Sequence, residues 1–101
     1  MYRASTPTHK YKLPFSRELI ENFLLTYSDV DTGEQILVKT IEDAEFIDDH
    51  NIKVTLTQEE TNLFNEGTAK AQFRVKTRNK KVIPSKDIYI RVYDVSNDEV
   101  I

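Results

Sequence analysis

The sequence predicts an all-β protein: an antiparallel immunoglobulin-like β-sandwich of about seven strands, with one short helical turn near residues 57–64. Apolar residues recur at every second position along most of the chain, which is the spacing of half-buried strands. Turn-forming residues interrupt this alternation about every 8–12 residues, as in Greek-key sandwiches. The length of 101 residues suits one domain, residues 1–101, of which we expect 1–6 and 96–101 to be flexible tails.

The first half of the chain contains five expected strands. In the first, Pro14 lacks a hydrogen-bond donor, so this strand should lie at a sheet edge. A loop rich in turn formers around Gly33 separates the second strand from the third. The apolar positions of the five strands are, in order, His9, Tyr11, Leu13 and Phe15; Phe23, Leu25 and Tyr27; Ile36 and Val38; the short segment 44–48; and Ile52, Val54 and Leu56.

A capped helical turn should connect the two halves. Thr57 and Glu60 have the spacing of a capping box, in which each side chain accepts a hydrogen bond from the other residue's backbone N–H. Leu63 and Phe64 would fix this turn to the core, and Gly67 would end it. Two more strands follow, with a turn at 78–81 and an interruption at 82–84 between them: Ala69, Ala71, Phe73 and Val75, then Ile88, Ile90 and Val92.

The composition excludes several classes of function. The chain has no cysteine, which leaves no disulfide, thiol nucleophile or cysteine-based zinc site. It shows no apolar leader and no apolar run of membrane-spanning length, so we expect neither export nor a membrane partner. No nucleophile–base arrangement is evident, and we expect no enzymatic activity and no cofactor.

Two weak metal motifs have simpler interpretations. Asp29, Asp31 and Gly33 faintly match a calcium loop, but the later acidic ligand is not at the required spacing. His50 stands among acidic residues that are equally typical of a solvated hairpin tip. His9 falls on an apolar strand face, where a hydrogen-bonded histidine at the margin of the core is expected more often than a catalytic one.

Charge is distributed unevenly along the chain. Residues 1–66 carry 6 Lys/Arg against 13 Asp/Glu, whereas residues 67–101 carry 8 against 4. The exposed side of the last strands should combine basic residues with tyrosines, which are common at interface centres. A solvated face, a protein interface and nucleic-acid binding all remain open, the last disfavoured by the net charge of −3. The candidate interface residues are Arg74, Lys76, Lys80, Lys81, Tyr89, Arg91 and Tyr93, with Asp29, Asp31, Asp48 and Asp49 as acidic counterparts.

Several segments resemble small proteins encoded among the structural genes of prophages in Gram-positive bacteria. They are Arg3-Ala-Ser-Thr-Pro-Thr-His, Leu13-Pro-Phe, Leu56-Thr-Gln-Glu-Glu-Thr with Leu63-Phe64, and Asn97-Asp-Glu-Val-Ile101. More distantly, residues 52–95 are similar to the immunoglobulin-like N-terminal domain of phage baseplate upper proteins. The resemblance supplies no catalytic residues.

The resemblance implies a structural or assembly module of the tail, baseplate or head. Such a protein is made in the bacterial cytoplasm and then becomes associated with the virion. Its partners would be other virion proteins or copies of itself, as a homo-oligomer in the assembled particle. The alternative is a ligand-recognition module that binds carbohydrate or a cell-surface component, with tyrosines as its aromatic platform.

Overall fold

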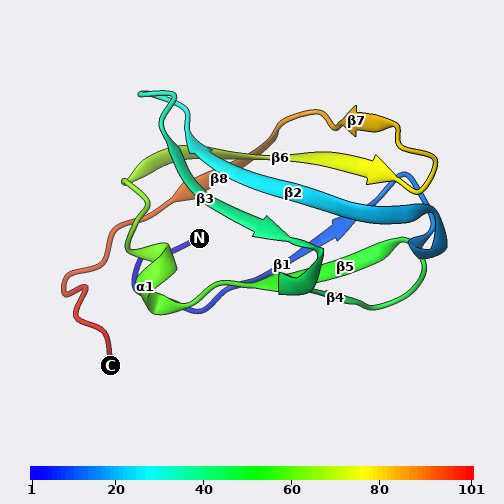
Figure 1. Cartoon of the computed structure of the whole chain (residues 1–101). Helices are drawn as coiled ribbons and strands as arrows, with labels where there is room; N and C mark the ends of the chain where they lie inside the picture. The colour runs from blue at the N-terminus through cyan, green and yellow to red at the C-terminus, as the bar shows by residue number, and fades with distance from the viewer.

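The computed structural model describes all 101 residues and shows a β-sandwich of two antiparallel sheets (Figure 1). The predicted sandwich with one short helical turn is confirmed, with eight strands instead of about seven. Its immunoglobulin-like character stays a prediction. The strands are β1 (Thr8–Lys12), β2 (Ile20–Asp29), β3 (Gln35–Thr40), β4 (Ala44–Phe46), β5 (Asn51–Thr55), β6 (Gly67–Thr77), β7 (Val82–Pro84) and β8 (Ile88–Val92), with helix α1 (Gln58–Thr61) and two 3₁₀ turns, η1 (Arg17–Leu19) and η2 (Ile41–Asp43).

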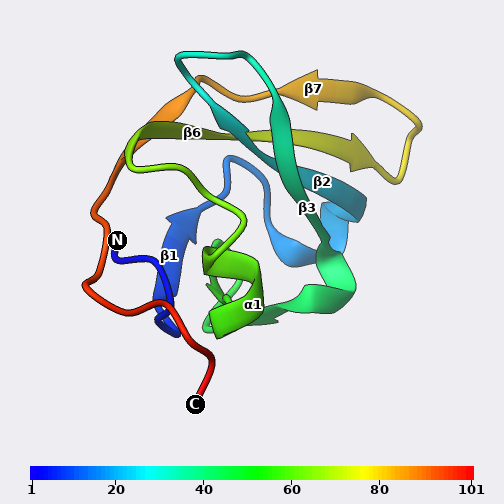
Figure 2. The same ribbon diagram turned by 90° about the vertical axis from the view of Figure 1, so that its left-hand side faces the viewer.

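The two sheets differ in width. The smaller sheet has the order β1-β5-β4, and the larger has the order β3-β2-β6, with both β7 and β8 paired to the far edge of β6. Strand β1 therefore lies at an edge, as Pro14 predicted. Turned by 90°, the molecule shows its two layers with α1 near one end of the sandwich (Figure 2).

The core lies between β2 and β6 of the larger sheet and the facing smaller sheet. Strand β6 buries alternate residues, as its sequence predicted, and Phe73 is 3% exposed. Phe73 lies opposite Leu25 in the register and packs edge-to-face against Tyr11 and Phe23, with ring centroids 5.1 and 5.2 Å apart. The alternation places every second residue of β6 on the outer face of the sheet.

The helical turn confirms the predicted capping box and corrects its surroundings. The Thr57 hydroxyl accepts from Glu60 N–H at 3.1 Å, and the Glu60 carboxylate accepts from Thr57 N–H at 2.9 Å. Phe64 is buried, but Leu63 is 57% exposed, because these adjacent side chains leave the backbone in different directions. Gly67 does not end the helix: Asn62 caps it, and Gly67 begins β6 with a φ of +133°.

Other corrections concern the strand ends. Strand β1 stops at Lys12, although Leu13 just beyond it is still buried. The segment Val82–Pro84 does not interrupt the sheet but forms the edge strand β7, a position that tolerates Pro84. Ile88 was expected in the core and is 37% exposed, because the narrower sheet does not fully cover β8.

Candidate functional site: the outer face of the larger sheet

The outer face of the larger sheet combines basic and apolar side chains. Cross-strand pairing sets Arg74 of β6 beside Leu24 of β2 and Pro84 of β7. The next outward residue of β6, Lys76, lies beside Val82. Because facing residues in adjacent strands are neighbours, these side chains form one continuous surface.

Arg74 is the central residue of this surface. Its side chain lines two shallow depressions, of about 470 and 410 Å³, that lie on either side of it. Leu24 lines both, while Val82 lines the first and Val38 the second. Arg74 makes no ion pair within 4 Å and no side-chain hydrogen bond, so its guanidinium presents all its donors to solvent.

The other predicted basic residues have different surroundings. Glu21 pairs with Lys80 at 2.8 Å and with Lys76 at 3.7 Å. The hydrogen bond from Lys80, followed by the charge of Lys76, lowers the pKa of Glu21. Lys81 is exposed in the turn after β6 and forms no ion pair. Glu21 thus neutralises part of the positive charge of Lys76 and Lys80, whereas the nearby Arg74 has no acidic partner.

The predicted tyrosines gather beside this face, at the edge formed by β8. Tyr89 and Tyr93 are 65% and 46% exposed, and the Arg91 guanidinium lies 5.6 Å from the centre of the Tyr93 ring. Sequence reasoning missed Tyr2, whose ring centre is 5.2 Å from that of Tyr93. A parallel bridge between residues 2 and 93 produces this contact, and no local pattern indicates it.

The two predicted acidic residues at the β2–β3 loop differ in exposure. Asp29 is only 6% exposed, because its carboxylate accepts from Asp31 N–H, Thr32 N–H and the Asn65 side chain. These bonds, led by that from Asn65, lower the pKa of Asp29 and hold the β2–β3 loop. Asp31 is exposed in that loop. Asp29 is therefore a structural residue and not part of an open surface.

Asp48 and Asp49 lie at the other end of the molecule. They belong to the β4–β5 loop, which lies at the same end of the sandwich as the β6–β7 turn (Figure 1). The Asp49 carbonyl accepts from the N–H of Arg17, the first residue of η1. Asp48 accepts from His50 N–H and from Asn51, and these bonds lower its pKa. The two acidic loops thus lie at opposite ends of the sandwich.

A polar cluster lies inside the molecule. The buried Tyr27 hydroxyl is 3.0 Å from both the Tyr11 hydroxyl and His9 Nδ1. Burial raises the pKa of both tyrosines and lowers that of His9. The cluster therefore holds neutral groups that satisfy one another's hydrogen bonds, as expected for a histidine at the margin of the core.

No group of three or more His, Asp or Glu side chains is arranged to hold a metal ion. The structure also has no helix with the length and apolar character needed to cross a membrane.

Comparison with protein-family models, with curated proteins and with solved structures finds no match to this chain. Support for the outer face of the larger sheet as the candidate site therefore comes from the geometry described above.

Proposed function

We propose that this chain is a non-enzymatic structural or assembly module of a phage or prophage particle, associated with its tail, baseplate or head. It acts through protein–protein contacts made by the outer face of the larger sheet. The observation that supports this most directly is the unpaired Arg74 guanidinium between two depressions, whose mixed polar and apolar lining includes Leu24, Val38 and Val82. The resemblance of the sequence to prophage structural proteins supports the association with a phage or prophage particle.

The chemistry of the surface favours a protein partner. An exposed arginine with apolar side chains beside it is typical of the residues that dominate binding energy at interfaces. Its planar guanidinium can hold a carboxylate through two parallel hydrogen bonds, while the surrounding apolar contacts exclude water. A sheet face also binds with little loss of conformational freedom, because its strands are already fixed.

An acidic loop of a second copy is the occupant that the charges favour. Asp31 and Glu34 are exposed in the β2–β3 loop, and neither forms an ion pair within 4 Å. This loop protrudes at one end of the sandwich (Figures 1 and 2). A contact between this loop and the Arg74 face joins two different surfaces, and such head-to-tail contacts generate rings or filaments.

Sedimentation velocity at several salt concentrations tests this proposal. The unmodified chain should self-associate at low salt and dissociate as salt rises, because the contact is electrostatic. Arg74→Glu should abolish this salt-dependent association, whereas Lys12→Glu, the same charge reversal on exposed β1, should not. Mixing Arg74→Glu with Asp31→Lys/Glu34→Lys should restore association. A chain that stays monomeric at every salt concentration, or an unaffected Arg74→Glu variant, would contradict the proposal.

A second candidate, recognition of carbohydrate or a cell-surface component, is favoured by the exposed patch of Tyr2, Arg91 and Tyr93. Aromatic rings of this kind can stack against sugar faces. Binding on a glycan array that persists in Arg74→Glu and is lost in Tyr93→Ala would favour this candidate over the first.

A further inference from the structure

The first three residues form a short arm that pairs with the end of β8. Tyr93 N–H donates to the Met1 carbonyl at 2.8 Å, and Arg3 N–H donates to the Tyr93 carbonyl at 2.9 Å. The Met1 nitrogen donates to the Arg91 carbonyl at 2.8 Å. The arm thus forms an isolated parallel bridge with Tyr93, just beyond the end of β8, and the Tyr2 and Tyr93 rings lie against each other.

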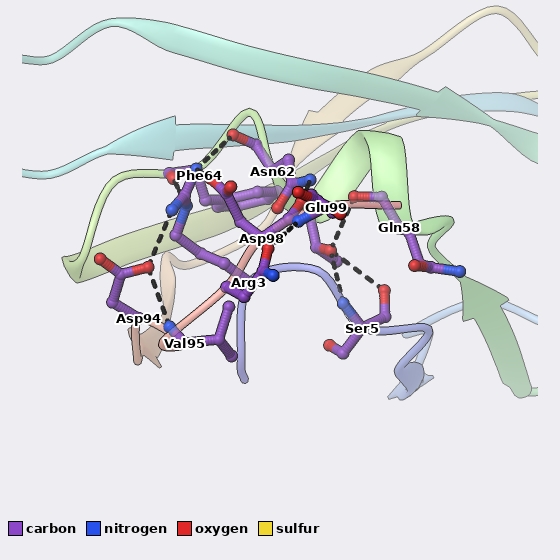
Figure 3. Close-up of polar contacts among 11 residues, drawn as sticks. Arg3, Ser5, Gln58, Asn62, Phe64, Asp94, Val95, Asp98 and Glu99 are labelled. Atoms are coloured by element: carbon purple, nitrogen blue, oxygen red, sulfur yellow. Dashed lines mark hydrogen bonds and ion pairs between the residues drawn. The ribbon is translucent and has the colours of Figure 1, made fainter. Parts of the chain in front are cut away.

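Arg3 anchors this arm with its side chain (Figure 3). The guanidinium bonds Asp94 at 2.8 Å and Asp98 at 3.3 Å. It also donates to the carbonyls of Phe64 and Asn62, at 2.9 and 3.2 Å, in the segment that follows α1. The receiving site for the arm therefore consists of the β8 end, two carboxylates and two carbonyls, and it recognises an arginine on an extended segment.

A strained residue separates the arm from the rest of the chain. Ala4 has a φ of +53°, in the left-handed region that alanine disfavours because its Cβ crowds the backbone. On the far side, Ser5 is fixed to Thr61: its N–H donates to the Thr61 hydroxyl at 3.1 Å, and that hydroxyl lies 3.0 Å from the Ser5 carbonyl, to which it donates. The strain therefore lies at a single pivot between two well-bonded segments.

We propose that residues 1–3 are exchanged between two copies of this chain, so that the receiving site of each copy binds the arm of the other. The exchanged arm makes the same hydrogen bonds and ion pairs as the closed arm, and only the pivot changes. Exchange releases Ala4 from its left-handed conformation, whereas the closed form retains the strain.

The geometry of exchange defines the dimer. Three extended residues reach about 10 Å, so the two β8 edges must lie close together around a two-fold axis. The exposed Tyr89, Arg91 and Tyr93 then lie beside the dimer contact, where they face the same patch of the second copy. This inference does not depend on the proposed function, because it uses the β8 edge and not the Arg74 face.

Substitution of Ala4 tests the exchange. Proline cannot adopt positive φ, and the Ala4 N–H makes no hydrogen bond that the substitution would remove. We expect Ala4→Pro to tighten dimerisation about tenfold or more in sedimentation equilibrium. Ala4→Val, which keeps the N–H, should act in the same direction, whereas Ala4→Gly relaxes the closed form and should weaken dimerisation. Monomeric Ala4→Pro and Ala4→Val, or equal dimerisation of Ala4→Gly, would overturn the proposal.

A charge-exchanged pair shows whether the arm itself makes the dimer. In an Ala4→Pro/Arg74→Glu background, which lacks the Arg74 contact, Arg3→Glu and Asp94→Arg/Asp98→Arg should each be monomeric alone, because each variant brings like charges together at the receiving site. A mixture of the two should form a heterodimer, because each receiving site then meets an arm of opposite charge. A dimer that persists in Arg3→Glu alone, or a mixture that stays monomeric, would show that the arm is not exchanged.

Discussion

The inner and outer faces of β6 carry opposite properties on adjacent residues. Phe73 points inward and is 3% exposed, between two aromatic rings of the core. Arg74, the next residue, points outward as an exposed and unpaired cation between two depressions. The comparison indicates that one strand separates the two tasks: its inner residues hold the fold, and its outer residues are available for contacts.

The largest expected effect is on the inner face. Phe73→Ala should lower the free energy of unfolding by about 3–5 kcal/mol, because it removes buried ring surface and leaves a cavity between Tyr11 and Phe23. Urea denaturation followed by circular dichroism measures this change. Arg74→Ala should alter stability by less than about 0.5 kcal/mol, since an exposed and unpaired side chain contributes little. An equal loss of unfolding free energy in Phe73→Ala and Arg74→Ala would show that the outer face contributes to stability as much as the inner face does.

A smaller effect is expected from one buried hydroxyl. Tyr27→Phe keeps the ring and removes the group that bonds both Tyr11 and His9, so each of these loses a partner inside the protein. The loss should be about 1–3 kcal/mol in the same urea measurement. Tyr89→Phe removes an equivalent hydroxyl from a residue that is 65% exposed and should change nothing. A Tyr27→Phe variant as stable as the parent would mean that the cluster contributes only its packing.

Local patterns predicted those parts of the fold that local physics decides. Alternation identified β2 and β6 because both are central strands with one face on the core, where every second residue must be apolar. The Thr57–Glu60 box was readable because its hydrogen bonds join residues three positions apart. In these segments the sequence contains the whole cause of the structure.

Other features depend on the widths of the sheets and on partners distant in sequence. Ile88 follows the same alternation as Phe73, yet β8 extends past the cover of the smaller sheet. Asp29 looks like a surface loop residue, but Asn65, 36 positions away, helps to cover it. The alternation of apolar and polar residues along the chain therefore predicts neither the exposure of Ile88 nor the burial of Asp29.

The candidate site was predictable only as a set of residue types. Arg74 was placed on an outward face by alternation alone. The compensation of Lys76 and Lys80 by Glu21 depends on contacts that span 55 residues or more, so all three basic residues looked equivalent in the sequence. The pairing of Tyr2 with Tyr93 is longer still in range.

The smallest expected effect is a pH dependence from the margin of the inner face. Burial, followed by the positive charge of the N-terminus, lowers the pKa of His9. The other groups that face its ring are the hydroxyls of Tyr11 and Tyr27, both kept neutral by raised pKa values. The unfolded chain, with a histidine pKa of about 6.5, therefore binds a proton at this position more readily than the folded chain.

Stability should accordingly fall as the pH drops below about 6.5 and should stop responding to His9 once the pH passes its folded pKa. The acidic groups with lowered pKa values, such as Glu60 and Asp94, lose their contributions only at more acidic pH, in the carboxylate range. His9→Gln should flatten the first decline in urea midpoints measured between neutral and mildly acidic pH, whereas His50→Gln, at an exposed loop position, should leave it in place. A decline in stability that survives His9→Gln and disappears in His50→Gln would contradict this prediction. It would show that protonation of the half-buried His9 does not cause the pH dependence.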